Sequence, residues 1–532
     1  MNISRRTLLA SSVAAAALLK APLAWAATPP DTLIQAWAID DIISLDPAEV
    51  FEFTASEILG NTYDGLVGYD VDDVTDISGV LAESWEVSED GKTFTFTMKP
   101  DLQFASGNPI TAADPVFSFV RVIKLDKSPA FILSQFGFTP DNVEETIRQT
   151  GDMTFEFEMD QAYAPTLVLY CLTATVGFIV DKALVLEHEA DGDFGYEWLK
   201  TNYAGSGPFV IRDWRANEAV VMERNQNYWG EPPALERSIY RHIPESATER
   251  LLLQEGDIDI ARKLSPQDIQ ALRGADGIKV QEGVKGSIYY LGLNQKNEYL
   301  SHPKVREAMK YLVDYEAIAD TVMEGLVEVH QSFLPKGFLG VLEETPYSLD
   351  VDKAKALLEE AGYPDGFTVT MDTRNTPDIT GMAQAIQQTM ARAGITIEII
   401  PGDGQQTLTK YRARNHDIYI GRWGPDYQDP HTNADTFARN PDNSDDASAK
   451  PLAWRNSWDI PEMTAMADAA VLEPDTEKRA EMYRELQREH QQVSPFVIMF
   501  QEIEVLAMRD EVENFIIGPS FNDNSFEFVT KG

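Results

Sequence analysis

The chain has a single cysteine, Cys171, among its 532 residues. One thiol cannot form a disulfide within the chain, so a small disulfide-stabilised fold is excluded. Cys171 lies in the apolar run 167–180, which predicts a small buried side chain, with a reactive thiol as the alternative. The sequence contains neither the His-Glu-x-x-His motif of zinc proteases nor the Gly-x-Ser-x-Gly motif of serine hydrolases. It therefore carries no local signature of these enzymes.

Basic residues are also scarce. The chain has 44 Lys and Arg against 86 Asp and Glu, which gives a formal net charge of -42. Affinity for nucleic acid depends on basic side chains that neutralise phosphates, so we exclude nucleic acid as a partner. The acidity is explained either by solubility or by a surface for a cationic ligand.

Long hydrophobic runs are missing too, since no segment has 18 consecutive apolar residues. Residues 1–26 have the three parts of an export signal: the Arg5-Arg6 pair, a short apolar stretch, and an Ala-x-Ala cleavage motif at 24–26. The arginine pair resembles a twin-arginine signal. We predict export by that route and cleavage near Ala27.

The chain contains two regions with clear secondary-structure patterns. Alternating Phe and Met side chains predict a hairpin over 84–98 and a strand over 153–159, within a sheet-rich α+β unit of residues 69–197. In the second half, apolar residues alternate at 367–371, 395–399 and 418–420, and recur at helical spacing between them. This βαβαβ order predicts an open α/β sheet.

Ligands of open α/β sheets bind outside the carboxyl ends of the strands. Arg374 follows the first predicted strand, and the loop after the third is rich in residues suited to ligand binding. These are Arg422, Trp423, Asp426, Tyr427 and Asp429. Aromatic and carboxylate side chains on a loop fixed by Gly and Pro are typical of a binding cleft. For Arg374 a solvated loop position is an equal alternative.

Motifs along nearly the whole chain after the signal resemble one family. They are LAESW at 81–85, the segment 104–119, GSGPF at 205–209, ERN at 223–225, YWG at 228–230, QEGDID at 254–259, LGLN at 291–294, HPKVREA at 302–308, the segment 353–367, and the loop 423–430. In this order they resemble solute-binding family 5 of ABC transporters, which includes dipeptide- and oligopeptide-binding proteins.

The resemblance implies a two-lobed α/β periplasmic binding protein of class II, cluster C type, with an extra α+β subdomain and a ligand cleft between the lobes. Lobe I would comprise 28–68, 198–285 and 503–532, with 69–197 as the subdomain. Lobe II would be 286–502. The crossovers between the lobes would act as a hinge.

The resemblance also implies roles for two site residues. Asp426 falls at the position where peptide-binding relatives pair an Asp with the ligand's α-ammonium group. Arg374 falls at or next to the position of an Arg that binds the ligand carboxylate. The loop departs from the family by inserting Arg422 and by carrying Pro425 and Gln428. The ligand therefore stays open among peptides, opines, oligosaccharides and nickel complexes.

We accordingly predict a periplasmic solute-binding component of an ABC importer, not an enzyme. It would be a monomer without a cofactor, would bind a short peptide or similar zwitterion, and would deliver it to an inner-membrane permease. A secreted hydrolase with two catalytic carboxylates is the alternative from another class. His416 and His431 flank the predicted site and are interpreted either as ligands of a metal complex or as solvated loop residues.

Overall fold

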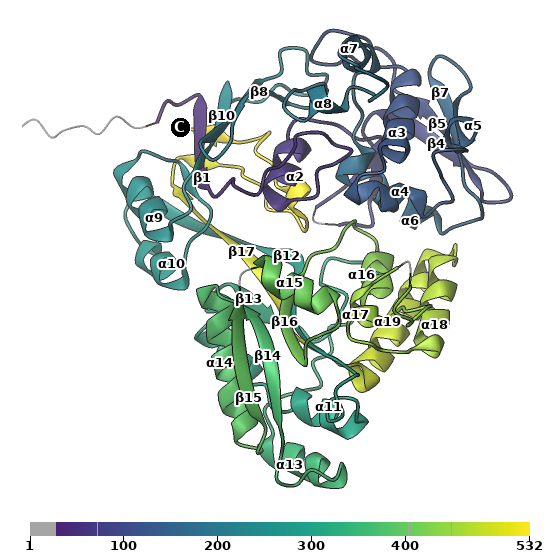
Figure 1. Ribbon diagram of the computed structural model, residues 1–532. Coiled ribbons are helices and arrows are strands. Elements are labelled where there is room, and N and C mark those ends of the chain that lie inside the picture. The colour runs from purple at the N-terminus through teal and green to yellow at the C-terminus, as the bar shows by residue number, and fades with distance from the viewer. Residues whose placement is uncertain (1–27, 72, 403, 448) are drawn as a thin grey trace, which may run out of the picture.

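The computed structural model describes residues 28–71, 73–402, 404–447 and 449–532. The predicted signal peptide and cleavage site lie outside this part of the chain. The molecule has two lobes, which Figure 1 shows one above the other, and we call them the upper and the lower lobe. No helix among the described residues is both long enough and apolar enough to cross a membrane.

One sheet of eleven strands runs through both lobes. Its order is β15-β14-β16-β12-β17-β11-β1-β10-β9-β8, and β13 pairs with β17. The strands are β1 (Thr32–Trp37), β8 (Phe209–Arg215), β9 (Ala219–Arg224), β10 (Arg237–His242), β11 (Ile260–Ala261), β12 (Ile278–Leu293), β13 (Val327–Val329), β14 (Thr368–Arg374), β15 (Thr396–Gly402), β16 (Ile418–Trp423) and β17 (Phe496–Arg509). The long antiparallel strands β12 and β17 cross from the upper to the lower lobe (Figure 1).

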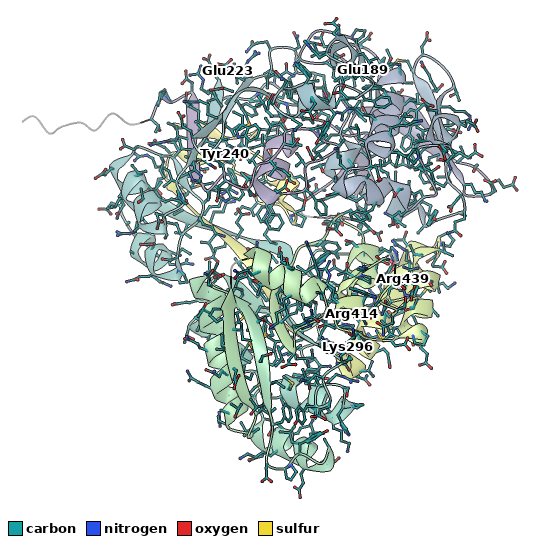
Figure 2. All side chains as sticks on the ribbon, in the orientation of Figure 1. Glu189, Glu223, Tyr240, Lys296, Arg414 and Arg439 are labelled. Carbon is teal, nitrogen blue, oxygen red and sulfur yellow. The ribbon has the colours of Figure 1, made fainter. Side chains whose placement is uncertain are left out.

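The upper lobe contains a second, smaller sheet of four strands. These are β4 (Ala82–Val87), β5 (Thr93–Met98), β6 (Ile147–Gln149) and β7 (Thr154–Glu158), in the order β4-β5-β7-β6. Phe94, Phe96 and Met98 alternate along β5 and are buried, which confirms the predicted hairpin. Cys171 is also buried in this subdomain core, as predicted. Another core of the upper lobe includes Tyr240 of β10, which is labelled in Figure 2.

The lower lobe contains the predicted βαβαβ unit. Strands β14, β15 and β16 are parallel, and α14 (Pro377–Ala391) and α15 (Gly404–Arg412) connect them. All three strands continue beyond their predicted ends, β15 to Gly402. β14 continues to Arg374, and β16 continues to Trp423 because the backbones of Arg422 and Trp423 pair with Tyr289 and Ile288 of β12. The prediction that Arg374, Arg422 and Trp423 lie in loops was therefore wrong.

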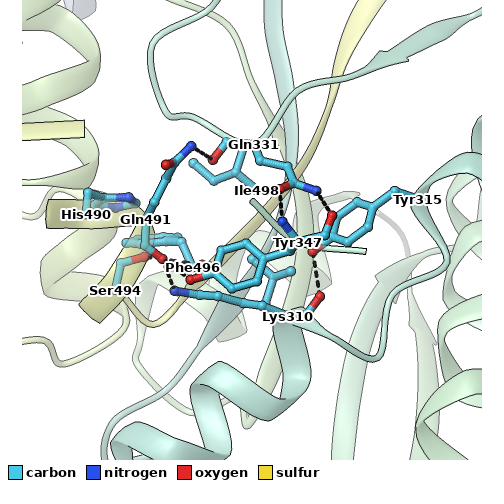
Figure 3. A pocket seen from close by; sticks show the side chains of 10 residues that line it. Lys310, Tyr315, Gln331, Tyr347, His490, Gln491, Ser494, Phe496 and Ile498 are labelled. Carbon is cyan, nitrogen blue, oxygen red and sulfur yellow. Dashed lines mark hydrogen bonds between the residues drawn. The ribbon is translucent and has the colours of Figure 1, made fainter. Parts of the chain in front are cut away.

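Lys310 is a buried cation in the lower lobe. It ends α11 (Pro303–Lys310), its exposed fraction is 2%, and its Nζ donates a hydrogen bond of 2.7 Å to the carbonyl oxygen of Gln491 (Figure 3). The space around it measures about 10 Å³, which is too small for a ligand. Burial, with a smaller contribution from the charge of Arg306, lowers the pKa of Lys310 to about 7. Ionised Lys310 therefore destabilises the fold.

We expect Lys310→Met to raise the free energy of unfolding by about 1–4 kcal/mol at pH 6, because methionine fills the space without a charge. Gln491 keeps one partner for its carbonyl oxygen, the hydroxyl of Tyr347 at 2.8 Å. Between pH 7 and 10.5 the unfolded wild type binds more protons than the folded protein, so wild-type stability rises with pH. The gain from the substitution should therefore be smaller at pH 9. Urea unfolding at both pH values measures it.

Lys304→Met on the same helix is the matched control, since Lys304 is exposed and pairs with Glu360. It should change stability little and equally at both pH values. A gain for Lys310→Met that is the same at pH 6 and pH 9 would contradict the buried-charge explanation.

The crossing strands are interrupted by a bulge where the lobes meet. The register of β12 on β17 shifts between Val284 and Ile288. Lys285 in this bulge is buried, and its Nζ binds the Asn524 side chain at 2.5 Å and a Glu504 carboxylate oxygen at 3.1 Å. We propose the bulge as the point where the lobes flex, in keeping with the predicted boundaries at 285/286 and 502/503.

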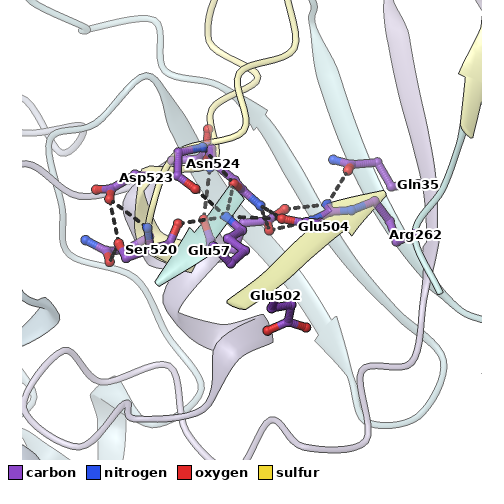
Figure 4. A network of polar contacts seen from close by, with 12 residues as sticks. Gln35, Glu57, Arg262, Glu502, Glu504, Ser520, Asp523 and Asn524 are labelled. Atoms are coloured by element: carbon purple, nitrogen blue, oxygen red, sulfur yellow. Dashed lines mark hydrogen bonds and ion pairs between the residues drawn. The ribbon is translucent and has the colours of Figure 1, made fainter. Parts of the chain in front are cut away.

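A buried ion network holds the C-terminal segment against this bulge. Arg262 donates to both carboxylate oxygens of Glu57, at 2.6 and 2.7 Å, and to Glu504 at 2.6 Å (Figure 4). Burial opposes the ionisation of Glu504, but the charges of Lys285 and Arg262 outweigh it and lower its pKa to about 2. Two cations and two carboxylates thus balance one another. The segment around the short helix η4 (Phe521–Asp523) is fixed beside the junction of the lobes.

Candidate ligand-binding site

A cavity of about 250 Å³ lies between the lobes beside this bulge, and we call it the inner cavity. Its walls come from six separate parts of the chain. They are Phe51, Phe53 and Ser56 in and before α2 (Phe53–Gly60), Ile132 of α4 (Phe131–Ser134) with 174–175, the bulge residues 286–287, the segment 422–426, and the C-terminal segment 519–522. Small-molecule pockets usually measure about 300–1,000 Å³, so the inner cavity suits a small ligand.

Asp426 is the acidic residue in this lining. Its backbone N–H donates to the hydroxyl of Thr432 at 3.1 Å. Burial, reinforced by the negative charge of Asp435, raises the pKa of its carboxyl group to about 7. Within the described part of the chain, no Lys, Arg or His forms an ion pair with Asp426. A partly buried carboxylate without an ion-pair partner favours binding of a cationic group.

Arg422 and Trp423 also line the inner cavity. The guanidinium of Arg422 lies 5.2 Å from the centre of the Phe53 ring and donates to Glu502 at 2.6 Å, so its charge is already neutralised. Trp423 is half-buried and packs edge-on against Phe437, with ring centres 6.4 Å apart. It is therefore both a wall of the cavity and part of the core of the lower lobe.

Arg374 lies elsewhere. It is the last residue of β14, is exposed, and its guanidinium is 3.7 Å from the position that a Cβ atom on Gly404 would take. It does not line the inner cavity. However, Asp372 pairs with Tyr419 in the parallel register, which places Arg374 level with Gly421 at the same edge of the sheet as the Asp426 segment.

Asp429 and Tyr427 are directed away from the inner cavity. Asp429 is fully buried and forms two parallel hydrogen bonds with Arg479, at 2.6 and 2.7 Å. It also accepts a hydrogen bond from the backbone N–H of His431 at the start of α16 (Pro430–Phe437). Tyr427 is 7% exposed and packs into the core of the upper subdomain. Neither residue lines the inner cavity.

The two histidines beside the site are buried, so their interpretation as solvated loop residues was wrong. His416 is 3% exposed, and its ring nitrogen Nε2 lies 3.0 Å from the side-chain oxygen of Asn456. Burial lowers the pKa of His416 to about 4, so this ring is neutral at pH 7. Burial lowers the pKa of His431 as well.

Sequence reasoning missed the parts of the cavity that come from the upper lobe and the C-terminal segment. Phe53, Ser56 and the segment 519–522 lie far in sequence from Asp426, and no pattern links them to it. Only the structure shows that Phe51 and Phe53, just before and at the start of α2, stay more than a third exposed.

The chain matches, over residues 76–445, the family model described as bacterial extracellular solute-binding proteins, family 5 Middle. It belongs to this family. The probable D,D-dipeptide-binding periplasmic protein DdpA of Escherichia coli K12 is 30% identical over 94% of both chains. The dipeptide-binding protein of the same organism is 26% identical over 88% of both chains.

Among solved structures, the ABC transporter-associated periplasmic binding protein DppA from Helicobacter pylori, in complex with the peptide STSA, superposes with a TM-score of 0.78. It is 26% identical, and the match covers 94% of this chain and 98% of that chain. The predicted family, the two-lobed α/β fold and the role of a solute-binding protein are therefore confirmed.

Proposed function

We propose that this protein captures a short peptide or a similar zwitterion in the periplasm and delivers it to the permease of an ABC importer, without chemical turnover. The observation that carries the proposal is the desolvated carboxylate of Asp426 in a small cavity between the lobes. The names of the relatives support it, because two relatives are described as dipeptide-binding and the Helicobacter pylori structure holds a peptide.

The charges around the cavity favour a zwitterion bound in one orientation. An α-ammonium group would pair with Asp426, whose charge has no counter-ion among the described residues. Arg422 is neutralised by Glu502, so the exposed Arg374 is the better partner for a carboxylate. Arg can bind a carboxylate through two parallel hydrogen bonds, which fixes the orientation of the ligand as well as its charge.

Closure of the lobes would complete this site. Asp426 lies on the lower lobe, and Phe53 and the 519–522 segment face it from the upper lobe. A ligand that contacts both lobes binds the closed form better and shifts the population toward it. The change in backbone conformation that closure requires would occur at the bulge of β12 between Val284 and Ile288.

The proposal also covers the export route and the oligomeric state. The Arg5-Arg6 pair and the cleavage motif at 24–26 support export by the twin-arginine route, with a mature chain that starts near Ala27. We propose that the mature protein acts as a monomer, since one closing cleft is sufficient to capture one ligand.

Calorimetry with L-Ala-L-Ala and D-Ala-D-Ala tests the proposal, and at pH 6 we expect binding to release a proton. Only ionised Asp426 attracts an ammonium group, and its pKa of about 7 leaves most of the free protein protonated at pH 6. Affinity should therefore be about five- to tenfold weaker at pH 6 than at pH 7.5. It should fall again above pH 8, where the peptide α-amino group, with a pKa of about 8, loses its proton.

The controls are the N-acetylated dipeptide, the dipeptide amide and maltose. The first lacks the positive charge, the second the negative charge, and the third both. We expect all three to bind more weakly than the free dipeptide. Binding of maltose in preference to both dipeptides would refute the zwitterion proposal, while the family assignment would stand.

A further inference from the structure

A second cavity, of about 530 Å³, lies between the lobes on the far side of the Asp426 segment, and we call it the outer cavity. The upper lobe contributes Phe131 and Tyr163 to it, and the lower lobe contributes Tyr427, His431, Asp435 and Arg439. Arg439 is labelled in Figure 2, among the helices of the lower lobe. The outer cavity is thus larger than the inner one and also has walls from both lobes.

At two places, residues that are adjacent in the sequence line different cavities. On α4, Ile132 lines the inner cavity and Phe131 the outer one. In the segment after β16, Asp426 lines the inner cavity and Tyr427 the outer one. Ile132 and Tyr427 both belong to the packed core of the upper subdomain. The partition between the cavities is therefore a layer of packed side chains that comes from both lobes.

Other contacts between the lobes hold this partition in place. The backbone N–H of Ala164 donates to the carbonyl oxygen of Val471 at 3.2 Å. The guanidinium of Arg479 donates to the hydroxyl of Thr166 at 3.1 Å while it binds Asp429. These contacts join the upper subdomain to the lower lobe beside Tyr427. The ring of Tyr427, only 7% exposed, cannot swing aside without breaking core contacts.

We infer that the partition built on Tyr427 and Ile132 is the wall that ends the binding site at the ammonium side of the ligand and so determines which ligands are accepted. The inference rests on the proposed function, in which Asp426 holds the ammonium group. Ile132 and Tyr427 form the partition between the cavity that Asp426 lines and the outer cavity, so a bulky group attached to the ligand nitrogen meets their packed side chains. The protein therefore accepts ligands with a free amino terminus and rejects those extended at the nitrogen, although an unused cavity lies behind the partition.

An N-benzyl dipeptide tests this wall, since its secondary ammonium group keeps the positive charge and adds bulk only at the nitrogen. The parent is whichever of L-Ala-L-Ala and D-Ala-D-Ala binds more tightly. We expect wild type to bind the N-benzyl form about 10- to 100-fold more weakly than the parent. Tyr427→Ala joins the two cavities and should remove most of this difference.

Two further variants keep the test decisive. Tyr427→Phe keeps the ring and should reject the N-benzyl form as wild type does. Ile132→Ala opens the same partition from the upper lobe and should admit the N-benzyl form even if Tyr427→Ala fails to fold. Circular dichroism confirms folding of each variant before calorimetry.

The outcomes separate this inference from the proposed function. If wild type binds the parent and the N-benzyl form equally, there is no wall and the inference is overturned. It is also overturned if the folded opened variants bind the parent but still reject the N-benzyl form. If wild type binds neither dipeptide, the proposed function fails and the inference fails with it.

Discussion

Replacing Asp426 by asparagine is expected to weaken dipeptide binding by about 30- to several-thousand-fold, which corresponds to about 2–5 kcal/mol. The substitution keeps the shape of the side chain and removes only the charge. When the lobes close, the ligand ammonium would then lose its hydrating water without gaining a counter-charge, which weakens the free energy of binding. Calorimetry at pH 7.5 measures the loss. The melting temperature should stay near that of wild type or rise, because the carboxylate removed is a desolvated one.

Asp435→Asn is the matched control for this experiment. Asp435 lines the outer cavity and not the inner one, and its charge raises the pKa of Asp426. Removing it should leave affinity at pH 7.5 nearly unchanged and strengthen binding at pH 6. Wild-type affinity in Asp426→Asn would show that Asp426 does not hold the ligand.

Arg374→Gln tests the other end of the ligand in the same assay. Arg374 lies outside the inner cavity, so its contribution depends on closure of the lobes around the ligand. A loss comparable to that of Asp426→Asn, absent with the dipeptide amide, would assign the carboxylate to Arg374. An unchanged affinity would place the carboxylate elsewhere and leave the role of Asp426 intact.

Asp429→Asn is expected to destabilise the fold by about 3–5 kcal/mol. Asp429 and Arg479 are both fully buried, and their paired hydrogen bonds measure 2.6 and 2.7 Å. Removing one charge leaves the other buried and uncompensated. Urea unfolding followed by tryptophan fluorescence measures the change.

Two comparisons identify the cause of this loss. Glu158→Gln removes one partner of the half-exposed pair with Arg148 and should cost no more than about 1 kcal/mol. The double variant Asp429→Asn with Arg479→Met should be less destabilised than the sum of the single variants, because it leaves no charge unpaired. A cost below 1 kcal/mol for Asp429→Asn alone would mean that the pair contributes little to stability.

The sequence predicted those features of the fold that depend on local patterns. Phe94, Phe96 and Met98 alternate along β5, so all three side chains lie on one face of the strand. That face is buried whichever sheet the strand joins. The βαβαβ order of the lower lobe likewise follows from the 2-residue and 3.6-residue periods along the chain. The ends of β14 and β16 were less predictable, because pairing with neighbouring strands extends them beyond their apolar residues.

The site was predicted less completely than the fold. Asp426, Arg422 and Trp423 do line the inner cavity, but Tyr427 and Asp429 from the same short segment do not. The chain turns after Trp423, so neighbouring residues face different surroundings. No local pattern shows that Asp429 will meet Arg479, fifty positions later, or that Tyr427 will enter the core of the other lobe.

The sequence by itself determined the family, the class of fold and the position of the acidic ligand-binding candidate, since motifs and periodicities are properties of neighbouring residues. Only the tertiary structure decided which side chains face the ligand. The inner cavity combines α2, α4, the β12 bulge, the end of β16 and the C-terminal segment. Whether these segments meet depends on the free energy of packing the whole chain. Long-range contacts, such as those of β12 with β17, contribute to that free energy as well as local contacts.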